Sequence, residues 1–211
     1  MKKKEQAQEP QVKIEEVSHE TESIEEHANV LFKPNEGPQT DFLAASEREV
    51  LYGGSAGGGK SYAMLADPLR YMGHPSFSGL LLRHTTEELR ELIFKSQELY
   101  PKIWKGIKWS ERKMQWTAPS GARLWMSYLD RDEDVLRYQG LAFSWIGFDE
   151  LTQWATPYAW NYMRSRLRST APDLPIFMRA TTNPGGRGHA WVKKMFIDPS
   201  AYGKAFDATN I

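Results

Sequence analysis

The sequence predicts an α/β fold with a mainly parallel central sheet flanked by helices. Short apolar strands alternate along the chain with amphipathic helices, a pattern that produces βαβ units and parallel strands. A glycine-rich turn joins the first strand to the first helix, and a later apolar strand ends in two adjacent carboxylates, Asp149 and Glu150. A pair of alternating segments between these two features adds a β-hairpin insertion.

Each element follows from the spacing of its apolar residues. We expect strands at 49–52, 79–83, 143–148 and 176–182, and helices at 60–72, 86–99 and 157–167. The hairpin consists of 114–116 and 124–128 around a turn at 118–121, which contains Pro119 and Gly121.

Composition narrows the class of protein before any motif is considered. The chain has 211 residues, 27 Lys+Arg against 27 Asp+Glu, 40% hydrophobic residues and no Cys. This is ordinary for a globular domain, and it excludes disulfides, cysteine-bound zinc, iron–sulfur clusters and thiol nucleophiles. No apolar run approaches the ~18 residues of a membrane span, and the N-terminal lysines have no apolar segment behind them. We therefore expect a soluble intracellular protein without a membrane partner.

Charge divides the chain into two parts. Residues 1–29 hold four lysines and eight glutamates, a net charge of −4, so the remainder carries +4. We expect 1–30 to be an acidic, disordered N-terminal arm and 31–211 to be the folded domain. An alternative for the arm is a docking segment that folds on a partner. Zero net charge gives no support for general nucleic-acid binding, although it allows a local basic surface.

The glycine-rich turn carries the strongest chemical signal. It matches G-x-x-x-x-G-K-[ST] in full, with Gly54, Ser55, Ala56, Gly57, Gly58, Gly59, Lys60 and Ser61. The glycines let main-chain N–H groups surround a phosphate, and Lys60 can reach the β- and γ-phosphates. The Ser61 hydroxyl can bind Mg²⁺. The alternative is a flexible glycine-rich loop. Such a loop would not need all eight residues to match the motif between a strand and a helix, so the match favours a phosphate loop.

The two carboxylates suggest a hydrolase. Asp149 lies 89 residues after Lys60 (149 − 60), and we expect it to hold Mg²⁺ together with Ser61. Side chains alternate along a strand, so Glu150 is free for a second task, the activation of water at the γ-phosphorus. Alone, such a pair is more often a solvated strand end. Together with the phosphate loop it predicts ATP hydrolysis.

These motifs resemble a P-loop nucleoside triphosphatase of the RecA-like class with a catalytic glutamate (ASCE), and specifically the large terminase subunits of tailed bacteriophages. Four segments carry the resemblance. They are 38–43 with Gln39, the phosphate loop, the strand ending at Asp149 and Glu150, and 180–186 with the sequence ATTNPGG. The resemblance spans about residues 32–196.

The resemblance implies roles that spacing alone does not give. Gln39 would read adenine, and Asn183 would sense the γ-phosphate and link hydrolysis to movement. Arg137 would be an arginine finger acting in cis or on a neighbouring subunit, with Arg83 as the second candidate. The implied activity is ATP-powered translocation of double-stranded DNA into a procapsid. The implied partners are a portal protein, the small terminase subunit and a homo-oligomeric ring, in the host cytoplasm.

Two basic clusters are candidate DNA contacts. The first is Arg164, Arg166 and Arg168 on the helix at 157–167, where 164 and 168 would share a face. The second is Arg187, Lys193 and Lys194. The alternative is that the nearby aromatic side chains belong to the core and the arginines are solvated or ion-paired. The five histidines show no metal-ligand spacing.

The sequence also departs from the large terminases. Members of that family carry a second, nuclease domain, and only about fifteen residues follow Phe196, so we expect no DNA cleavage by this chain. Other readings remain open at this point. They are a helicase or RecA-like ATPase, a nucleotide-gated assembly module with little hydrolysis, and, least favoured, a small-molecule kinase.

Overall fold

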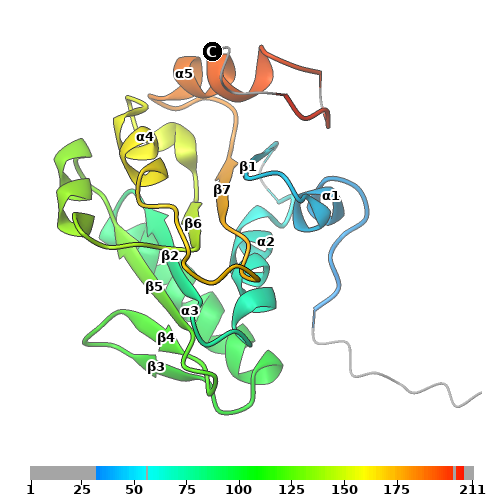
Figure 1. Cartoon of the computed structure of the whole chain (residues 1–211). Helices are drawn as coiled ribbons and strands as arrows, with labels where there is room; N and C mark the ends of the chain where they lie inside the picture. Colours follow the sequence, from blue (N-terminus) through cyan, green and yellow to red (C-terminus); the bar gives the residue numbers. More distant parts are fainter. Residues whose placement is uncertain (1–31, 56, 202, 207–211) are drawn as a thin grey trace, which may run out of the picture. The chain divides into compact units, whose positions relative to one another are not determined.

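A seven-stranded mixed sheet organises the domain (Figure 1). The computed structural model describes residues 32–55, 57–201 and 203–206. The strand order is β1-β7-β6-β2-β5-β4-β3, in which β1, β7, β6, β2 and β5 are parallel and β4 and β3 are antiparallel. The strands are β1 Glu49–Gly53, β2 Ser78–Arg83, β3 Lys108–Ser110, β4 Gln115–Thr117, β5 Arg123–Tyr128, β6 Trp145–Phe148 and β7 Phe177–Thr182.

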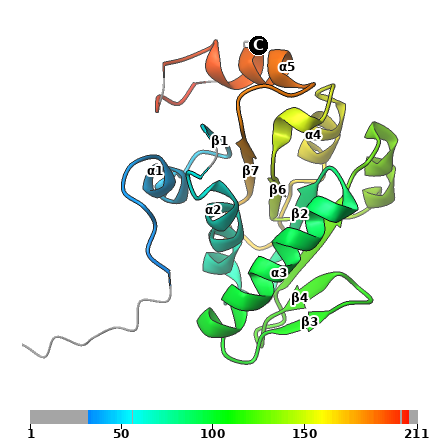
Figure 2. The same ribbon diagram turned by 180° about the vertical axis from the view of Figure 1, so that it is seen from behind.

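Helices cover both faces of the parallel part of the sheet. On one face lie α1 Pro38–Ala44, α2 Lys60–Ala66, the 3₁₀ segment η1 Asp67–Tyr71 and α3 Thr86–Ile103 (Figure 2). On the other lie the 3₁₀ segments η2 Asp132–Tyr138 and η3 Leu151–Gln153, then α4 Tyr158–Arg164, α5 His189–Val192 and the π-helical η4 Lys193–Ile197. None of the described helices is long and apolar enough to cross a membrane.

Alternation along the central strand divides the apolar core in two. Leu81 packs into the core beneath α2 and α3, whereas Leu80 and Leu82 pack into the core beneath α4 and η2. All three are fully buried. Burial on both faces is typical of a strand in the middle of a parallel sheet, and it fixes the register that brings the strand ends together.

The predicted α/β class and the hairpin are confirmed. The turn at 118–121 joins β4 to β5 as expected, but β5 also pairs in parallel with β2, so one arm of the hairpin is part of the main sheet. The strand β3 and the helices α1 and α5 did not stand out in the sequence. The acidic arm predicted at 1–30 lies outside the described residues.

Two predicted elements are shorter than expected, for identifiable reasons. The helix expected at 60–72 stays α-helical only to Ala66 and continues as η1, where Pro68 lacks the N–H that an α-helix would use. The helix expected at 157–167 ends at Arg164. The expectation that Arg164 and Arg168 share a helix face is therefore wrong, because Arg168 lies beyond the helix.

Candidate active site

The carboxyl ends of the parallel strands gather the candidate residues at one edge of the sheet. Because β7 lies between β1 and β6, the phosphate loop after β1 and the carboxylates after β6 flank the end of β7 (Figure 1). Asn183 follows directly after β7, and Arg83 ends β2 on the far side of β6. Ligands of open α/β sheets bind at this edge.

The phosphate loop curls around the ammonium group of Lys60. Lys60 is buried, and its Nζ donates to the carbonyl oxygens of Gly54, at 3.0 Å, and Ser55, at 2.6 Å. An ammonium has three donors, so one is left for another acceptor. Gly54 and Gly59 have φ of +146° and +71°, conformations that favour glycine. Ala56 lies outside the described residues.

Gln39 connects the phosphate loop to α1. It is buried on α1; its Oε1 accepts from the main-chain N–H of Asn35 at 2.6 Å, and its Nε2 donates to the carbonyl oxygen of Gly59 at 2.9 Å. A Cβ at position 59 would lie only 2.7 Å from Gln39 Nε2, so glycine permits this close approach. The side-chain amide predicted to read adenine is therefore bonded to the protein in this structure.

Glu150 and Asn183 form the best-defined contact in the site. The main-chain N–H of Asn183 donates to Glu150 Oε2 at 3.0 Å, and the side-chain Nδ2 donates to Oε1 at 2.7 Å. Both carboxylate oxygens are therefore fixed by one residue, which directly follows the neighbouring strand β7. Asn183 Oδ1 is buried and accepts no hydrogen bond from the described residues.

Asp149 is completely buried between β7 and β2. Its Oδ1 accepts a hydrogen bond from the hydroxyl of Thr181, and its Oδ2 lies 3.2 Å from Arg83 Nε. This second contact is an ion pair without a hydrogen bond. Among the described residues, therefore, Asp149 Oδ2, Arg83 Nε and Arg83 Nη1 are buried without a hydrogen-bond partner.

The pKa values of both acids are raised. Burial raises the pKa of Asp149, while the charge of Arg83 and the hydroxyl of Thr181 pull it down. Burial also raises the pKa of Glu150; the N–H of Asn183 lowers it, and the charge of Asp149 adds to the rise. The charge of Lys60 acts on both carboxyls. Shifts of this kind, in acids gathered at one strand edge, are typical of functional sites.

Strand alternation does not separate the two acids, contrary to the expectation from sequence. The strand β6 ends at Phe148, and Glu150 adopts a left-handed conformation with φ of +61°. Its main-chain N–H donates to Thr181 Oγ1 at 3.2 Å, so the hydroxyl that bonds Asp149 also anchors the backbone of Glu150. A non-glycine residue in this region is strained by about 1–3 kcal/mol, and such strain clusters at functional sites.

Thr181 is the site residue that sequence reasoning did not single out. It lies between Ala180 and Thr182 in the segment ATTNPGG, but nothing in the sequence marked which of the two threonine hydroxyls would face the carboxylates. The next residue, Thr182, bonds instead to Thr152 Oγ1 at 2.7 Å, and Thr152 accepts from the N–H of Gly188 at 2.7 Å. The end of β7 is thus tied both to the acids and to the segment that leads into α5.

Arg137 lies apart from these contacts. It is on η2, its Nη2 donates to the carbonyl oxygen of Tyr128 at 2.6 Å, and its side chain is 46% exposed. None of its contacts among the described residues reaches the phosphate loop. Tyr128 ends β5, so Arg137 is presented outward from the same edge of the sheet, two strands beyond β6.

Three of the six side chains in the two predicted basic clusters are ion-paired or stacked. Arg164 bonds to Glu49 at 2.7 Å, and Arg166 lies over the ring of Tyr162. Lys193 pairs with Asp198 at 2.7 Å. Trp160 of α4 is buried in the core, as the alternative reading of these aromatic side chains proposed.

Comparison with known proteins identifies the family. The family described as phage terminase large subunit matches residues 46–210. The chain belongs to that family. No curated protein matches it.

Solved terminases share the fold. The large terminase of a thermophilic bacteriophage is 19% identical with a TM-score of 0.60, over 79% of this chain and 43% of that one. Its complex with ADP gives a TM-score of 0.58 at 19% identity, over 76% and 41%. The large terminase ATPase domain of Thermus phage P74-26 is 14% identical with a TM-score of 0.53, over 74% and 66%. The fold is thus the P-loop type of these ATPase domains, and the chain spans less than half of the first of these proteins.

Proposed function

We propose that this chain is the Mg²⁺-dependent, ATP-hydrolysing motor domain of a terminase large subunit, which drives double-stranded DNA into a procapsid. The observation that carries the proposal is the carboxylate of Glu150, held by both nitrogens of Asn183 beside a complete phosphate loop. A fixed carboxylate in that position suits a base that takes a proton from water. The neighbour solved with ADP supports a nucleotide as the ligand.

The loop residues bind and orient the triphosphate. The main-chain N–H groups of 54–61, with Ser55, Ala56, Gly57 and Gly58 among them, surround the phosphates, and the remaining donor of Lys60 reaches the β- and γ-phosphates. We keep Gln39 as an adenine-reading residue, which requires its amide to exchange at least one of its contacts with Asn35 and Gly59 for the base.

Ser61 and Asp149 are the proposed Mg²⁺ ligands. Within the described ranges no three His, Asp or Glu side chains are grouped to hold a metal ion. That fits Mg²⁺ in nucleotide sites, which takes one or two protein ligands and otherwise phosphate oxygens and water. The buried Asp149 Oδ2 makes an ion pair with Arg83 but no hydrogen bond among the described residues, which also fits this role. When bound, the ion would neutralise charge on the phosphate oxygens.

Glu150 and Asn183 act on the attacking water. Glu150 accepts its proton, and the unpaired Asn183 Oδ1 is an acceptor that orients it. Asn183 also follows β7, whose Thr182 contacts the segment leading to α5 through Thr152. Loss of the γ-phosphate would therefore change the contacts of Glu150 and Asn183 and, through Thr182, those of the segment that leads to α5. This is the proposed link from hydrolysis to movement.

The cellular setting follows from the family. We propose a homo-oligomeric ring on the procapsid portal, with the portal protein and the small terminase subunit as partners, in the cytoplasm of the infected host. In such a ring the exposed Arg137 would act as a finger on the neighbouring subunit, since no contact among the described residues ties it to its own phosphate loop.

The test is steady-state ATP hydrolysis across a protein concentration series. Wild type is compared with Glu150→Ala and with Glu98→Ala, which removes an exposed glutamate of α3 as a matched control. We expect at least a ~100-fold loss for Glu150→Ala with ATP binding retained, and no loss for the control. Equal rates for wild type and Glu150→Ala would reject the hydrolase.

The same series tests Arg137. A rate per subunit that rises with concentration, and that Arg137→Ala abolishes, would support a finger acting between subunits. A rate independent of concentration and unaffected by Arg137→Ala would remove that role and leave the rest of the proposal standing.

A further inference from the structure

The strands β3, β4 and β5 have one covered face and one polar face. Trp116 and Leu124 point into the core beneath α3 and are buried. Their neighbours in sequence, Thr117 and Arg123, therefore lie on the opposite face. No described helix contributes to the core on that side of β3 and β4, whose residues are absent from the second core cluster.

Register places the polar residues in a row across the sheet. Lys108 on β3 pairs with Thr117 on β4, Thr117 with Arg123 on β5, and Arg123 with Ser78 on β2. Adjacent strands are ~4.8 Å apart, so the four residues span about 14 Å. The row crosses the sheet at the edge opposite to the ATP site, because Ser78 begins the strand that Arg83 ends.

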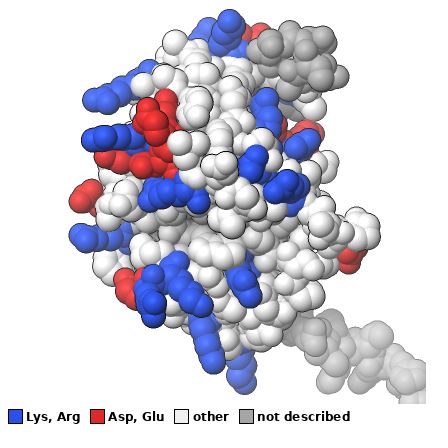
Figure 3. All heavy atoms as spheres, turned by 60° about the vertical axis from the view of Figure 1, so that its left-hand side comes forward, with Lys and Arg blue, Asp and Glu red and all other residues white. Residues whose placement is uncertain are grey.

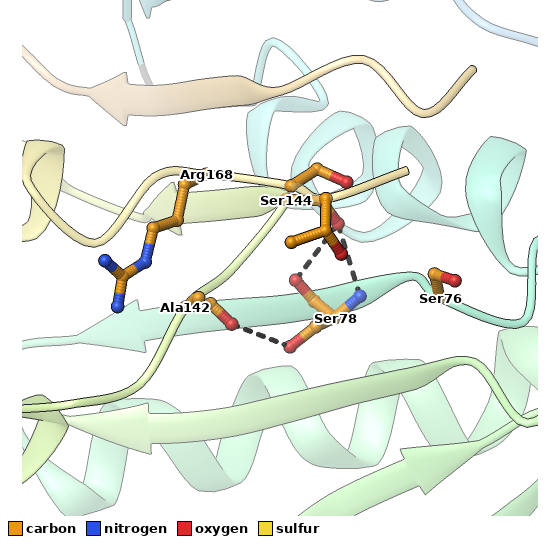
Figure 4. Close-up of a pocket in the computed structure, with 7 residues that line it drawn as sticks. Ser76, Ser78, Ala142, Ser144 and Arg168 are labelled. Carbon is orange, nitrogen blue, oxygen red and sulfur yellow. Dashed lines mark hydrogen bonds between the residues drawn. The ribbon is translucent and has the colours of Figure 1, made fainter. Parts of the chain in front are cut away.

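A shallow hollow of about 210 Å³ continues the row. It is lined by hydroxyl and cationic side chains, namely Ser76, Ser78, Ser144, Arg168, Ser169 and Thr170, with Ala142. Figure 4 shows Ser78 and Ser144 side by side, with Arg168 on one side of them and Ser76 on the other. The main-chain N–H of Ser78 donates a hydrogen bond to Ser144 Oγ, with 3.2 Å between N and Oγ.

Exposed cations stand beside the hydroxyls of this surface. We call it the basic strand face and define its cations as Lys108, Arg123 and Arg168, all of which are exposed. In the part of the chain that the structure describes, none of the three side chains has an ion pair or a hydrogen bond to a protein group.

Some cations elsewhere on the surface are neutralised by a neighbour. Arg137, Arg164 and Lys193 are each paired with an acidic side chain. Arg90 and Lys102 of α3 have no such pair among the described residues, but they lie away from the row of hydroxyls. Lys and Arg predominate over the lower part of the surface in Figure 3, whereas acidic side chains gather higher up. A local excess of unpaired positive charge is the electrostatic signature of a surface for phosphates.

We propose that the basic strand face binds the sugar-phosphate backbone of double-stranded DNA. Hydroxyls together with Lys and Arg are the usual donors to phosphate oxygens. The ~14 Å row exceeds the ~12 Å width of the major groove, so it can reach phosphates on both sides of a groove. Trp125, the aromatic side chain on this face of β5, is half-buried and edge-on to Phe143. That arrangement does not suit base stacking on a single strand.

This inference rests on the proposed function, in which DNA is the translocated polymer, and adds the surface that contacts it. The experiment measures binding of a labelled 30-base-pair duplex by fluorescence anisotropy at several salt concentrations. The variant Lys108→Glu/Arg123→Glu is compared with Arg90→Glu/Lys102→Glu. The second pair removes one Arg and one Lys from the exposed side of α3 on the opposite face, with the same change in net charge.

We expect the face variant to lose at least ~10-fold in affinity near 0.1 M salt, with a salt slope smaller by about 2, since each phosphate contact contributes ~0.9. The neutral variant Lys108→Gln/Arg123→Gln should show a smaller loss in the same direction, and the α3 control less than ~3-fold. Equal losses in the two charge-reversed variants, retained affinity in the face variant, or no duplex binding by wild type would each overturn the inference.

ATP hydrolysis without DNA separates this inference from the proposed function. The face variant should keep the wild-type rate, because its residues lie at the opposite edge of the sheet from Glu150. A wild type that binds duplex through this face yet matches Glu150→Ala in hydrolysis would reject the motor and keep the surface. Normal hydrolysis with DNA affinity unchanged by the face variant would reject the surface and keep the ATPase.

Discussion

Two buried Arg–Asp pairs, Arg179 with Asp67 and Arg83 with Asp149, differ in their surroundings. Arg179 on β7 is fully buried near Asp67, with Nη1 and Nη2 donating to the carbonyl oxygens of Glu47 and Ala45 at 2.8 and 2.9 Å. Asp67 also accepts from Trp145 Nε1 at 2.7 Å. Arg83 has no such main-chain acceptors among the described residues. Its Nε, like that of Arg179, faces its aspartate without a hydrogen bond, and its Nη1 also makes none.

The difference separates structure from chemistry. The guanidinium of Arg179 donates to fixed carbonyl oxygens, so it connects β7 with the segment before β1. The guanidinium of Arg83, at the end of β2, still has donors that make no hydrogen bond among the described residues. They can bind another acceptor, and the phosphate loop implies that this acceptor is a phosphoryl oxygen. The two pairs should therefore respond differently to the loss of the arginine.

The largest expected effect is on folding, from Arg179→Ala. Removing this arginine leaves the carbonyl oxygens of Glu47 and Ala45 without their donor and takes a cation from beside Asp67, which keeps its bonds to Arg70 and Trp145. Breaking a buried ion pair costs about 3–5 kcal/mol. For a domain of this size the melting temperature should fall by on the order of 10 °C. Urea unfolding followed by circular dichroism measures the change. A loss below 1 kcal/mol would mean that this pair does not hold β7 in place.

Arg83→Gln should act mainly on turnover. We expect kcat for ATP hydrolysis to fall ~100-fold or more, because the variant removes the buried cation beside Asp149. The fall should exceed any loss of folded protein measured in the same sample. Arg83→Lys is the matched variant, since it keeps the charge and loses the fork of donors. A variant with normal kcat would place Arg83 in the same structural class as Arg179.

A smaller effect is expected from Asn183→Ala. This change removes the 2.7 Å bond from Nδ2 to Glu150 but keeps the main-chain bond at 3.0 Å. We expect kcat to fall about 10–100-fold with ATP affinity little changed, because one of two bonds still orients the carboxylate. Asn161→Ala, on the exposed side of α4, is the control. Weaker ATP binding with normal kcat would instead indicate that Asn183 acts on the ground state.

The sequence indicated the residue types of the candidate site more readily than the way in which they are arranged. The phosphate loop, Asp149 and Glu150 stood out because glycines, a lysine and paired acids in this order serve one chemistry. The two hydrogen bonds from Asn183 to Glu150 depend on the left-handed backbone conformation of Glu150. No Gly or Asn at that position indicates such a conformation in the sequence. The partner of Arg83 depends on the strand order, since β2 and β6 are neighbours in space but are separated by 61 residues between Arg83 and Trp145 (145 − 83 − 1).

The smallest expected effect is a pH dependence of stability that Glu150→Gln removes. Burial raises the folded-state pKa of Glu150 above its value in the unfolded chain. The folded state therefore binds the extra proton more tightly, and wild type loses stability as pH rises from the unfolded pKa through the folded one. Glutamine does not titrate, so the stability of Glu150→Gln relative to wild type should grow over that interval and level off above it. Melting temperatures of both proteins from pH 4.5 to 8 measure the difference, whatever the glutamine costs in its own hydrogen bonds. A difference that is flat with pH would show that the grip of Asn183 on the carboxylate offsets burial completely, which would make Glu150 a poorer base than the site requires.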